Sequence, residues 1–235
     1  MYSVNSKKTF MQPNLWDWAV LFLIFSVIAV ISWNFDSSLT DYKNNNVILE
    51  PYNLFNYSIK TFIRMLIALM ISILFTIIVA PLAAKNKYIE VIIIPIIDIL
   101  ESLPILTISA FVFLFAVSIT RSYAFSLELA AIAAVFFCQV WNMTISMYQS
   151  IKTLPKELKQ LAKSMDLNSW QKFWHIELAY SLPGLITNSM ISMSAGWFYI
   201  VESEALTIAN KEYYVQGIGS YLALAVLNNS FQHKF

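Results

Sequence analysis

Residues 65–84 read MLIALMISILFTIIVAPLAA, a run of twenty residues without one charged side chain. At about 1.5 Å per residue, an α-helix of this length matches the roughly 30 Å hydrocarbon core of a bilayer. Lipid offers backbone amides and carbonyls no hydrogen-bonding partner, so a segment that crosses it forms a helix. The run therefore predicts a membrane-spanning helix and an all-α integral membrane fold.

Four further stretches are equally apolar and lack charged residues: residues 18–33, 102–120, 129–151 and 178–201. The first of them begins at Trp18 and ends at Trp33, as expected for rings that settle at the headgroup level of a membrane. Together with residues 65–84, these stretches predict five spanning helices.

The composition of the whole chain fits a protein whose surroundings are mostly lipid. It is 58% hydrophobic and 12% charged, with a mean hydropathy of +0.62, whereas a soluble domain carries about a quarter charged residues. A net charge of +1 gives no basic surface for nucleic acid. Membrane lipid is therefore an expected partner and nucleic acid is not.

The residue types that catalytic and metal sites need are scarce. Cys138 is the only cysteine and lies in an apolar run, which excludes disulfides and CxxC metal sites. No GxxxxGK[ST] loop is present, so the chain does not bind ATP in that way. His175 and His233 both lie outside the apolar runs, which leaves a membrane enzyme without a ligand cluster or a nucleophile and base. We expect no catalytic residue, no metal and no cofactor.

Lysine and arginine predict the orientation, because positively charged loops stay in the cytoplasm. An N-terminus inside the cell puts nine of these residues in cytoplasmic segments and five outside. The nine are Lys7, Lys8, Lys85, Lys87, Lys152, Lys156, Lys159, Lys163 and Lys172. The prediction is a cytoplasmic N-terminus, residues 1–15, with residues 151–178 as the largest cytoplasmic segment.

Residues 151–178 are too polar to span a membrane and too regular for a loose linker. A second short helix is predicted to open at Asn168, where Gln171 completes a capping box. The composition leaves open whether the segment lies on the lipid surface or docks a partner. The apolar residues at the spacing of one helix face are Leu158, Leu161, Ala162 and Met165.

Residues 155–184 resemble the EAA loop of binding-protein-dependent ABC permeases, which has the form E-A-A, three residues, G, nine residues, I-x-L-P. In that pattern Gln160, Leu161 and Ala162 take the E-A-A places, Asp166 the glycine, Ile176 and Leu178 the I and L, and Ala179 the proline. The sequence departs from the pattern at Gln160, Asp166 and Ala179.

Five further stretches are similar to the nitrate, sulfonate, taurine and bicarbonate branch of that family. They are SWQKFW (169–174), LPG (182–184), SMSAGWF (192–198), ESEA (202–205) and GIGSY (217–221). Within the branch they resemble the N-terminal half of members that fuse two permease domains in one chain and lack the EAA-loop glycine. The resemblance covers about residues 55–228.

This resemblance implies a type I ABC importer permease domain over residues 16–228, with residues 151–178 as its cytoplasmic coupling loop. Five of the six expected spanning helices are present, and the apolar segment after residue 217 is too short to span. Residues 229–235 form an atypical tail, and we expect a truncated chain. The implied location is the bacterial inner membrane, crossed several times.

The function implied by the resemblance is the membrane subunit of an ATP-driven importer. The solute would be a small anion such as nitrate, sulfonate, taurine or bicarbonate. ATP hydrolysis would take place on a separate ABC ATPase, and the chain itself would not be an enzyme. The other implied partners are a second permease domain or subunit and an extracytoplasmic substrate-binding protein. The alternative is a non-transporting membrane scaffold or an inactive truncated permease.

In this family the EAA loop is the helix that fits a cleft on the ATPase. The resemblance implies that contact for a set of apolar and bulky side chains with Asp166 among them. A turn role for Asp166 stays open beside a direct contact. The predicted coupling residues are Leu158, Leu161, Ala162, Met165, Asp166, Leu167, Trp170 and Phe173.

Polar residues at membrane depth are candidates for the solute path. Asp98 and Glu101 share one side of a helix with Glu90. They line the path or are solvated at the interface, and the interface is favoured for Glu90. Other candidates, with interhelix hydrogen bonding as the alternative, are Asn142, Thr187, Asn188 and Ser189.

The remaining polar residues near the runs have simpler interpretations. Ser192 and Gly196 have the small-xxx-small spacing that lets helices approach closely. Arg64 is expected to reach the outer headgroups from the start of its helix. Glu202 and Glu204 are expected at the outer surface, solvated or in contact with a binding protein.

Overall fold

The computed structural model describes residues 47–208 and 211–232. All of them belong to the second of two compact units into which the chain divides, residues 42–235. The helix predicted at residues 18–33 and the predicted cytoplasmic segment 1–15 lie outside the described residues.

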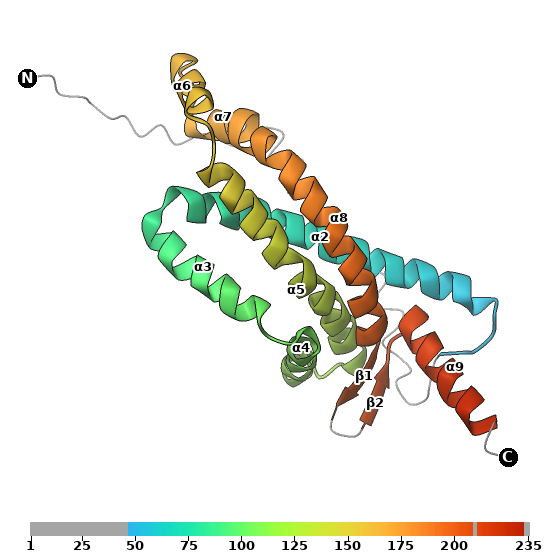
Figure 1. The fold of residues 1–235 in the computed structure, drawn as a ribbon. Helices are drawn as coiled ribbons and strands as arrows, with labels where there is room; N and C mark the ends of the chain where they lie inside the picture. Colours follow the sequence, from blue (N-terminus) through green and yellow to red (C-terminus); the bar gives the residue numbers. More distant parts are fainter. Residues whose placement is uncertain (1–46, 209–210, 233–235) are drawn as a thin grey trace, which may run out of the picture. The chain divides into compact units, whose positions relative to one another are not determined.

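The described part is mostly helical, with one two-stranded sheet (Figure 1). The longer helices are α2 (Asn53–Lys85), α3 (Lys87–Glu101), α4 (Ile105–Thr120), α5 (Tyr123–Lys152) and α8 (Leu178–Ser203). Between α5 and α8 lie α6 (Lys156–Ser164), α7 (Ser169–Lys172) and the π-helical turn η1 (Phe173–Glu177). The C-terminal elements are β1 (Ala205–Ile208), β2 (Lys211–Tyr214) and α9 (Ile218–Gln232).

Helix α5 is the centre of the packing, because it contacts both α2 and α8 over most of its length. One cluster of this three-helix core holds Met65 of α2, Val135 of α5 and Ile200 of α8, all buried. Gly196 of α8 faces α5, where an added Cβ would lie 3.0 Å from Nε2 of Gln139. The small residue therefore sets how closely α8 approaches α5, and the packing role predicted for Gly196 is confirmed.

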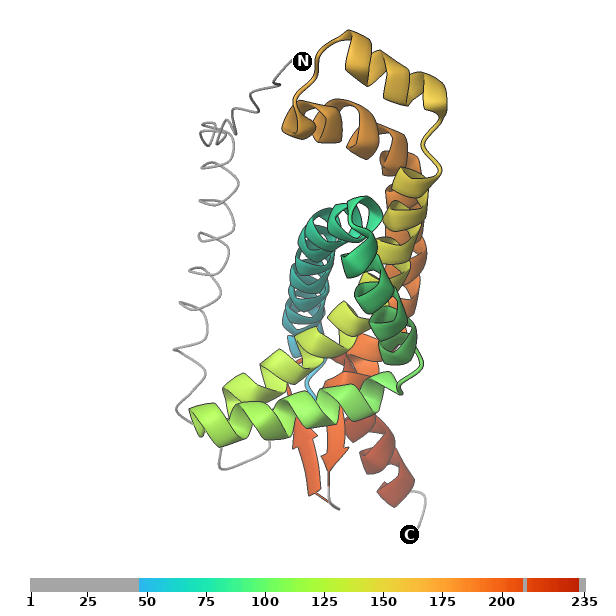
Figure 2. The ribbon, with the colours of Figure 1, turned by 90° about the vertical axis from the view of Figure 1, so that its left-hand side faces the viewer.

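By length and composition, two described helices are apolar enough to cross a membrane, α2 and α5. Helices α3 and α4 would make a third span if counted together, but they meet at an angle of 101° (Figure 2). The break falls just before α4, at Pro104, where a proline keeps the preceding residue out of helical conformation. Helix α8 has 26 residues, but its serines and asparagine lower its hydropathy. The count of five spanning helices stays a prediction.

The helices at four of the predicted runs are confirmed, and two of them extend well beyond the apolar residues. Helix α2 begins at Asn53, twelve residues before the run at 65–84. Helix α5 begins at Tyr123 and includes Glu128. Charged residues are tolerated in these extensions because Arg64 and Glu128 pair with each other inside the protein.

The hairpin of β1 and β2 is an addition that the apolar pattern does not predict. The strands run antiparallel, with Ala205 opposite Tyr214 and Leu206 opposite Tyr213. Leu206 and Val215 pack on Phe113 of α4 and Leu127 of α5. The hairpin therefore packs against the middle of α4 and the start of α5.

Candidate functional site

The segment between α5 and α8 forms an element of two short helices that packs on itself. Ala162 of α6 is buried against Leu154 and Ile176, and Leu158 and Leu167 pack at the edge of the same cluster. This inner cluster uses half of the predicted apolar face of α6. The other half is turned outward.

The outward half carries large apolar side chains that the described chain leaves uncovered. Leu161 is 48% exposed and Met165 is 60% exposed. A groove of about 410 Å³ lies beside them, lined by Leu161, Met165, Leu167, Gln171, His175 and Ile176. Trp170 and Trp174 are also exposed at this end, in edge-to-face contact at 5.5 Å. We call this region the α6–α7 surface.

Two of the predicted coupling residues support the α6–α7 surface from beneath instead of belonging to it. Ala162 lies in the inner cluster described above. Phe173 is buried against Ala80 of α2 and against Met147 and Ile151 of α5. Neither side chain is accessible to a docking protein, so the exposed set is reduced to Leu161, Met165, Asp166 and Trp170, with Leu158 and Leu167 half-buried.

Asp166 stands at the turn that ends α6, where its φ is +47°, in the left-handed region. The N–H of Leu167 donates to the carbonyl of Ala162 at 3.1 Å, and the N–H of Asp166 donates to that of Lys163 at 3.1 Å. These two bonds form the Schellman motif that commonly closes a helix, with its left-handed position usually taken by glycine. The turn role left open for Asp166 thus has direct geometric support.

The next helix opens as predicted. Asn168 and Gln171 form a reciprocal capping box at the start of α7, in which the N–H of Asn168 donates to Oε1 of Gln171 at 3.1 Å. The Schellman turn and the capping box follow each other within six residues. Together they fix the angle between α6 and α7.

A buried carboxylate lies beneath this element, at the end of η1. Glu177 has a side chain that is 3% exposed, and its Oε2 lies 2.6 Å from Nζ of Lys85, the last residue of α2. Its Oε1 lies 3.6 Å from Nζ of Lys172, the last residue of α7. The Lys85 ammonium also stands 5.3 Å from the centre of the Phe173 ring. We call this the Glu177 site; sequence reasoning gave Glu177 no role.

A second buried charged site lies at the other end of the bundle, where α2 and α5 begin. The guanidinium of Arg64 pairs with the carboxylates of Glu128 on α5 and Glu204 after α8. One of its nitrogens, Nη2, donates to Glu128 at 2.6 Å and to the carbonyl of Gln216 at 3.0 Å. Arg64 is 4% exposed, so the expectation that it reaches the headgroups is wrong.

Glu204 completes this Arg64 site. Its carboxylate accepts hydrogen bonds from Nη1 of Arg64 at 2.6 Å, from the Thr61 hydroxyl at 2.7 Å and from the N–H of Gly219 at 2.8 Å. The side chain is fully buried, so the surface role expected for Glu204 is also wrong, whereas Glu202 is exposed. The site joins α2, α5, the end of α8 and the start of α9.

Two glycines allow the chain to pack closely around this site. A Cβ on Gly217 would overlap the Glu204 carboxylate, and a Cβ on Gly219 would overlap the carbonyl of Val201. The stretches ESEA (202–205) and GIGSY (217–221) are thereby two halves of one structure. A carboxylate that follows one helix is clamped by the glycine-containing turn that opens the next.

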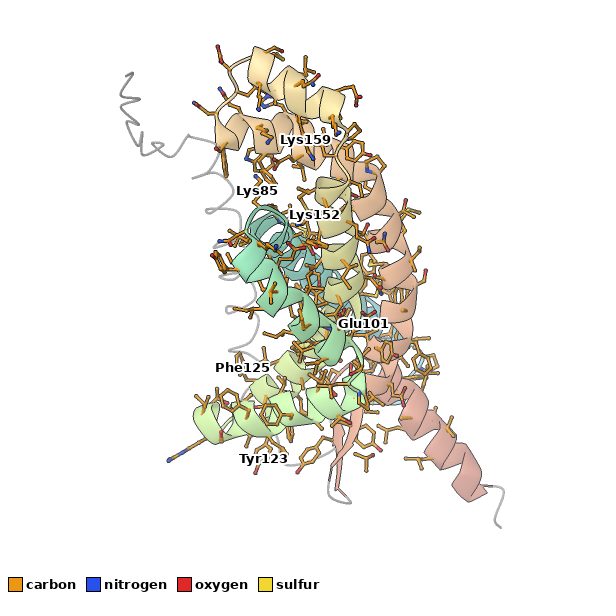
Figure 3. All side chains as sticks on the ribbon, turned by 60° about the vertical axis from the view of Figure 1, so that its left-hand side comes forward. Lys85, Glu101, Tyr123, Phe125, Lys152 and Lys159 are labelled. Carbon is orange, nitrogen blue, oxygen red and sulfur yellow. The ribbon has the colours of Figure 1, made fainter. Side chains whose placement is uncertain are left out.

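The predicted path carboxylates do not gather at one place. Glu90 pairs with Lys152 at 2.6 Å and accepts a hydrogen bond from the Tyr148 hydroxyl at 2.5 Å. Asp98 and Glu101 are exposed on α3. Figure 3 places Lys85 and Lys152 beneath the α6–α7 element and Glu101 at the far end of α3. The three acidic residues share a helix face but not a common environment.

The uncharged candidates for the solute path, on α5 and α8, also lie in different environments. Asn188 bridges the two helices, since its Nδ2 donates to the Ser146 hydroxyl at 2.9 Å. Thr187 and Ser189 donate to carbonyls of their own helix, and Asn142 is exposed on α5. Among the described residues, no group of three or more His, Cys, Asp or Glu side chains could hold a metal ion.

Long apolar helices and a polar two-helix element held between two of them define a multi-pass membrane protein. The model of the family described as "Binding-protein-dependent transport system inner membrane component" matches residues 72–231, more than half of the chain. The chain therefore belongs to this family and is a permease component of an ABC importer. No curated protein sequence matches it.

Proposed function

We propose that this chain forms the translocation path of an importer for a small solute and couples to a separate ATPase through the α6–α7 surface. The observation that carries the proposal is the uncovered apolar side chains of Leu161 and Met165 beside a groove. An exposed apolar patch rimmed by polar residues is typical of a protein–protein contact. The lysines of α6 would fix the register of that contact.

The residues beneath the α6–α7 surface support a coupling role over a loose attachment. The capping box and the Schellman turn hold α6 and α7 at a fixed angle. Phe173 anchors the element in the bundle against both α2 and α5. A displacement of the α6–α7 surface would therefore be transmitted to the spanning helices, because no flexible loop separates them in the described part of the chain.

For the solute, the resemblance to the nitrate and sulfonate branch favours a small anion. We propose that exposed or partly exposed polar residues of α5 and α8 line its path, with Asn142, Thr187 and Ser189 the nearest candidates, while Asn188 also holds the two helices together. Asp98 and Glu101 would repel an anion at close range. For an anionic solute these two carboxylates belong at the interface.

The docking role is tested by Leu161→Asp in the complete transporter. An unpaired charge in a desolvated contact costs several kcal/mol, and about 1.4 kcal/mol is tenfold in affinity. We expect ATPase binding to fall by at least about a hundredfold, measured by copurification and titration in nanodiscs. The matched control is Lys159→Ala on the same helix, which should change binding little. Retained ATPase binding, with the segment released from lipid, would show that the surface is a membrane-lying helix.

The proposed orientation puts the α6–α7 surface and the N-terminus in the cytoplasm. A cysteine at Lys159, in a chain whose Cys138 is changed to alanine, should react with a membrane-impermeant maleimide only in inside-out vesicles. A cysteine at Asn45 should react only in the opposite preparation. The reverse pattern would place the α6–α7 surface outside, where no ATPase could reach it.

A further inference from the structure

The Glu177 site sits where the proposed docking element meets the spanning helices. Glu177 is the last residue of η1 and is followed directly by α8, so its backbone moves with α8. Its carboxylate lies 2.6 Å from Nζ of Lys85, which ends α2. One ion pair thus joins the start of one spanning segment to the end of another.

Few other contacts join α2 and α8 directly. Helices α2 and α8 touch each other much less than either touches α5. At the α6–α7 end the link between them includes the Lys85–Glu177 pair and an apolar cluster, in which Phe173 and Leu178 meet Ile77, Ala80 and Ala84 of α2. A change at this pair therefore acts on how α2 and α8 move together, with less effect on the core around α5.

The Glu177 carboxylate lies on a π-helical turn. Leu178 donates its N–H to the carbonyl of Phe173, five residues back. Phe173 and Glu177 are both buried on this wider turn. π-Helical turns are rare and recur at functional sites, because an inserted residue redirects the side chains around it.

The lysines that face Glu177 are suited to movement. Lys85 and Lys172 have side chains that are 43% and 37% exposed. An ammonium on a flexible stem tolerates displacement better than a guanidinium, which binds through a planar fork. The pair can therefore persist while the two helix ends that it joins move together.

We infer that Glu177 is a positioning residue that, through Lys85, makes the end of α2 follow the α6–α7 element when the ATPase moves it. This rests on the proposed ATPase docking. Lys172 contacts the same carboxylate at 3.6 Å but belongs to the element itself, so it does not transmit the movement to α2.

The test measures whether α2 follows. In a Cys138→Ala background, nitroxide labels at Leu82→Cys on α2 and Lys159→Cys on α6 report their separation by pulsed EPR. The complete transporter with its ATPase, in nanodiscs, is compared without nucleotide and trapped with ATP and vanadate. In the chain with an intact Lys85–Glu177 ion pair, the separation of the two labels should be the same in both states, because α2 and α6 move together.

Glu177→Gln should make that separation shift or broaden on trapping, with ATPase binding unchanged. Lys85→Gln should give the same result, and the double variant no more, since the two changes remove one interaction. Lys172→Gln is the matched control and should behave like the unaltered protein. Glu177→Gln keeps the size of the side chain and the two lysine changes shorten it, and unchanged unfolding temperatures would show that the fold persists.

A constant separation in Glu177→Gln, with ATPase bound normally, would overturn the inference and leave the docking proposal standing. ATPase that does not bind the unaltered chain, or binds Leu161→Asp equally well, would overturn both. An equal shift in Lys172→Gln would also contradict the inference, because the carboxylate would then act within the α6–α7 element.

Discussion

The two ends of the bundle each hold a buried carboxylate with a cation on α2, but they are built differently. The Arg64 site is enclosed: its guanidinium is 4% exposed and binds two carboxylates and a carbonyl. The Glu177 site has two ammonium groups on side chains that remain over a third exposed. About 30 Å of α2 separates Arg64 from Lys85.

The difference indicates that one end of the bundle is fixed and the other is adjustable. Arginine is preorganised for paired contacts with carboxylates, so several bonds break together if the Arg64 site opens. Lysine loses one contact at a time and regains water as it does so. Movement imposed at the α6–α7 element would then pivot on the end held by Arg64.

The substitution Arg64→Ala is the strongest test of the statement that one end of the bundle is fixed. It leaves Glu204 buried without its cation, and removing one partner of a buried ion pair costs about 3–5 kcal/mol. We expect a large loss of folded protein in membranes and a much lower unfolding temperature in detergent. Arg64→Lys should recover only part of the loss, because lysine lacks the planar fork. Normal unfolding of Arg64→Ala, alongside a neutral Lys156→Ala control, would show that this end is not fixed by the arginine.

The next largest effect on stability is expected in the turn that contains Gly217 and Gly219. A Cβ on Gly219 meets the backbone carbonyl of Val201, which cannot turn away. Overpacking of this kind typically costs about 1–3 kcal/mol, and Gly219→Ala should lower the unfolding temperature accordingly. Gly184→Ala is the control, because its Cβ would meet only side-chain hydroxyls, of Ser146 at 3.1 Å and Ser150 at 3.5 Å, and alanine favours a helix. Equal effects of the two changes would mean that the turn readily adapts.

The smallest effect is expected at the adjustable end, in the turn of Asp166. A β-branched residue in the left-handed region costs about 1–3 kcal/mol, so Asp166→Val should speed amide exchange at Leu167, whose N–H closes the Schellman motif. Asp166→Gly should leave exchange there equal or slower. Neither change should alter global unfolding by more than about 1 kcal/mol, because the turn lies outside the spanning core. A global loss from Asp166→Val would mean that the two ends are not separate.

The sequence could predict what local pattern determines. The apolar runs located four of the long helices, and the pair of Asn168 and Gln171 located the start of α7. The spacing of Ser192 and Gly196 indicated close packing, which Gly196 makes against Gln139. Each of these signals lies within a few residues of the feature that it specifies.

What the sequence could not predict depends on pairs far apart along the chain. Arg64 binds carboxylates 64 and 140 residues away, so nothing near it distinguishes a buried arginine from one that reaches the headgroups. Glu177 stands between Ile176 and Leu178 in an apolar motif. A lone carboxylate at such a position was a usable signal for a buried ion pair. The hairpin of β1 and β2 has four-residue strands, too short for a pattern of alternation.

The φ of Asp166 has a consequence for how relatives of this chain are sought. The position that the EAA pattern writes as glycine is here a left-handed residue, and aspartate and asparagine also adopt that conformation. A search pattern that admits only glycine there selects one amino acid where the backbone requires only a torsion angle. Patterns that accept Gly, Asn or Asp at this position would recover permeases whose loop has the same backbone geometry with a different amino acid.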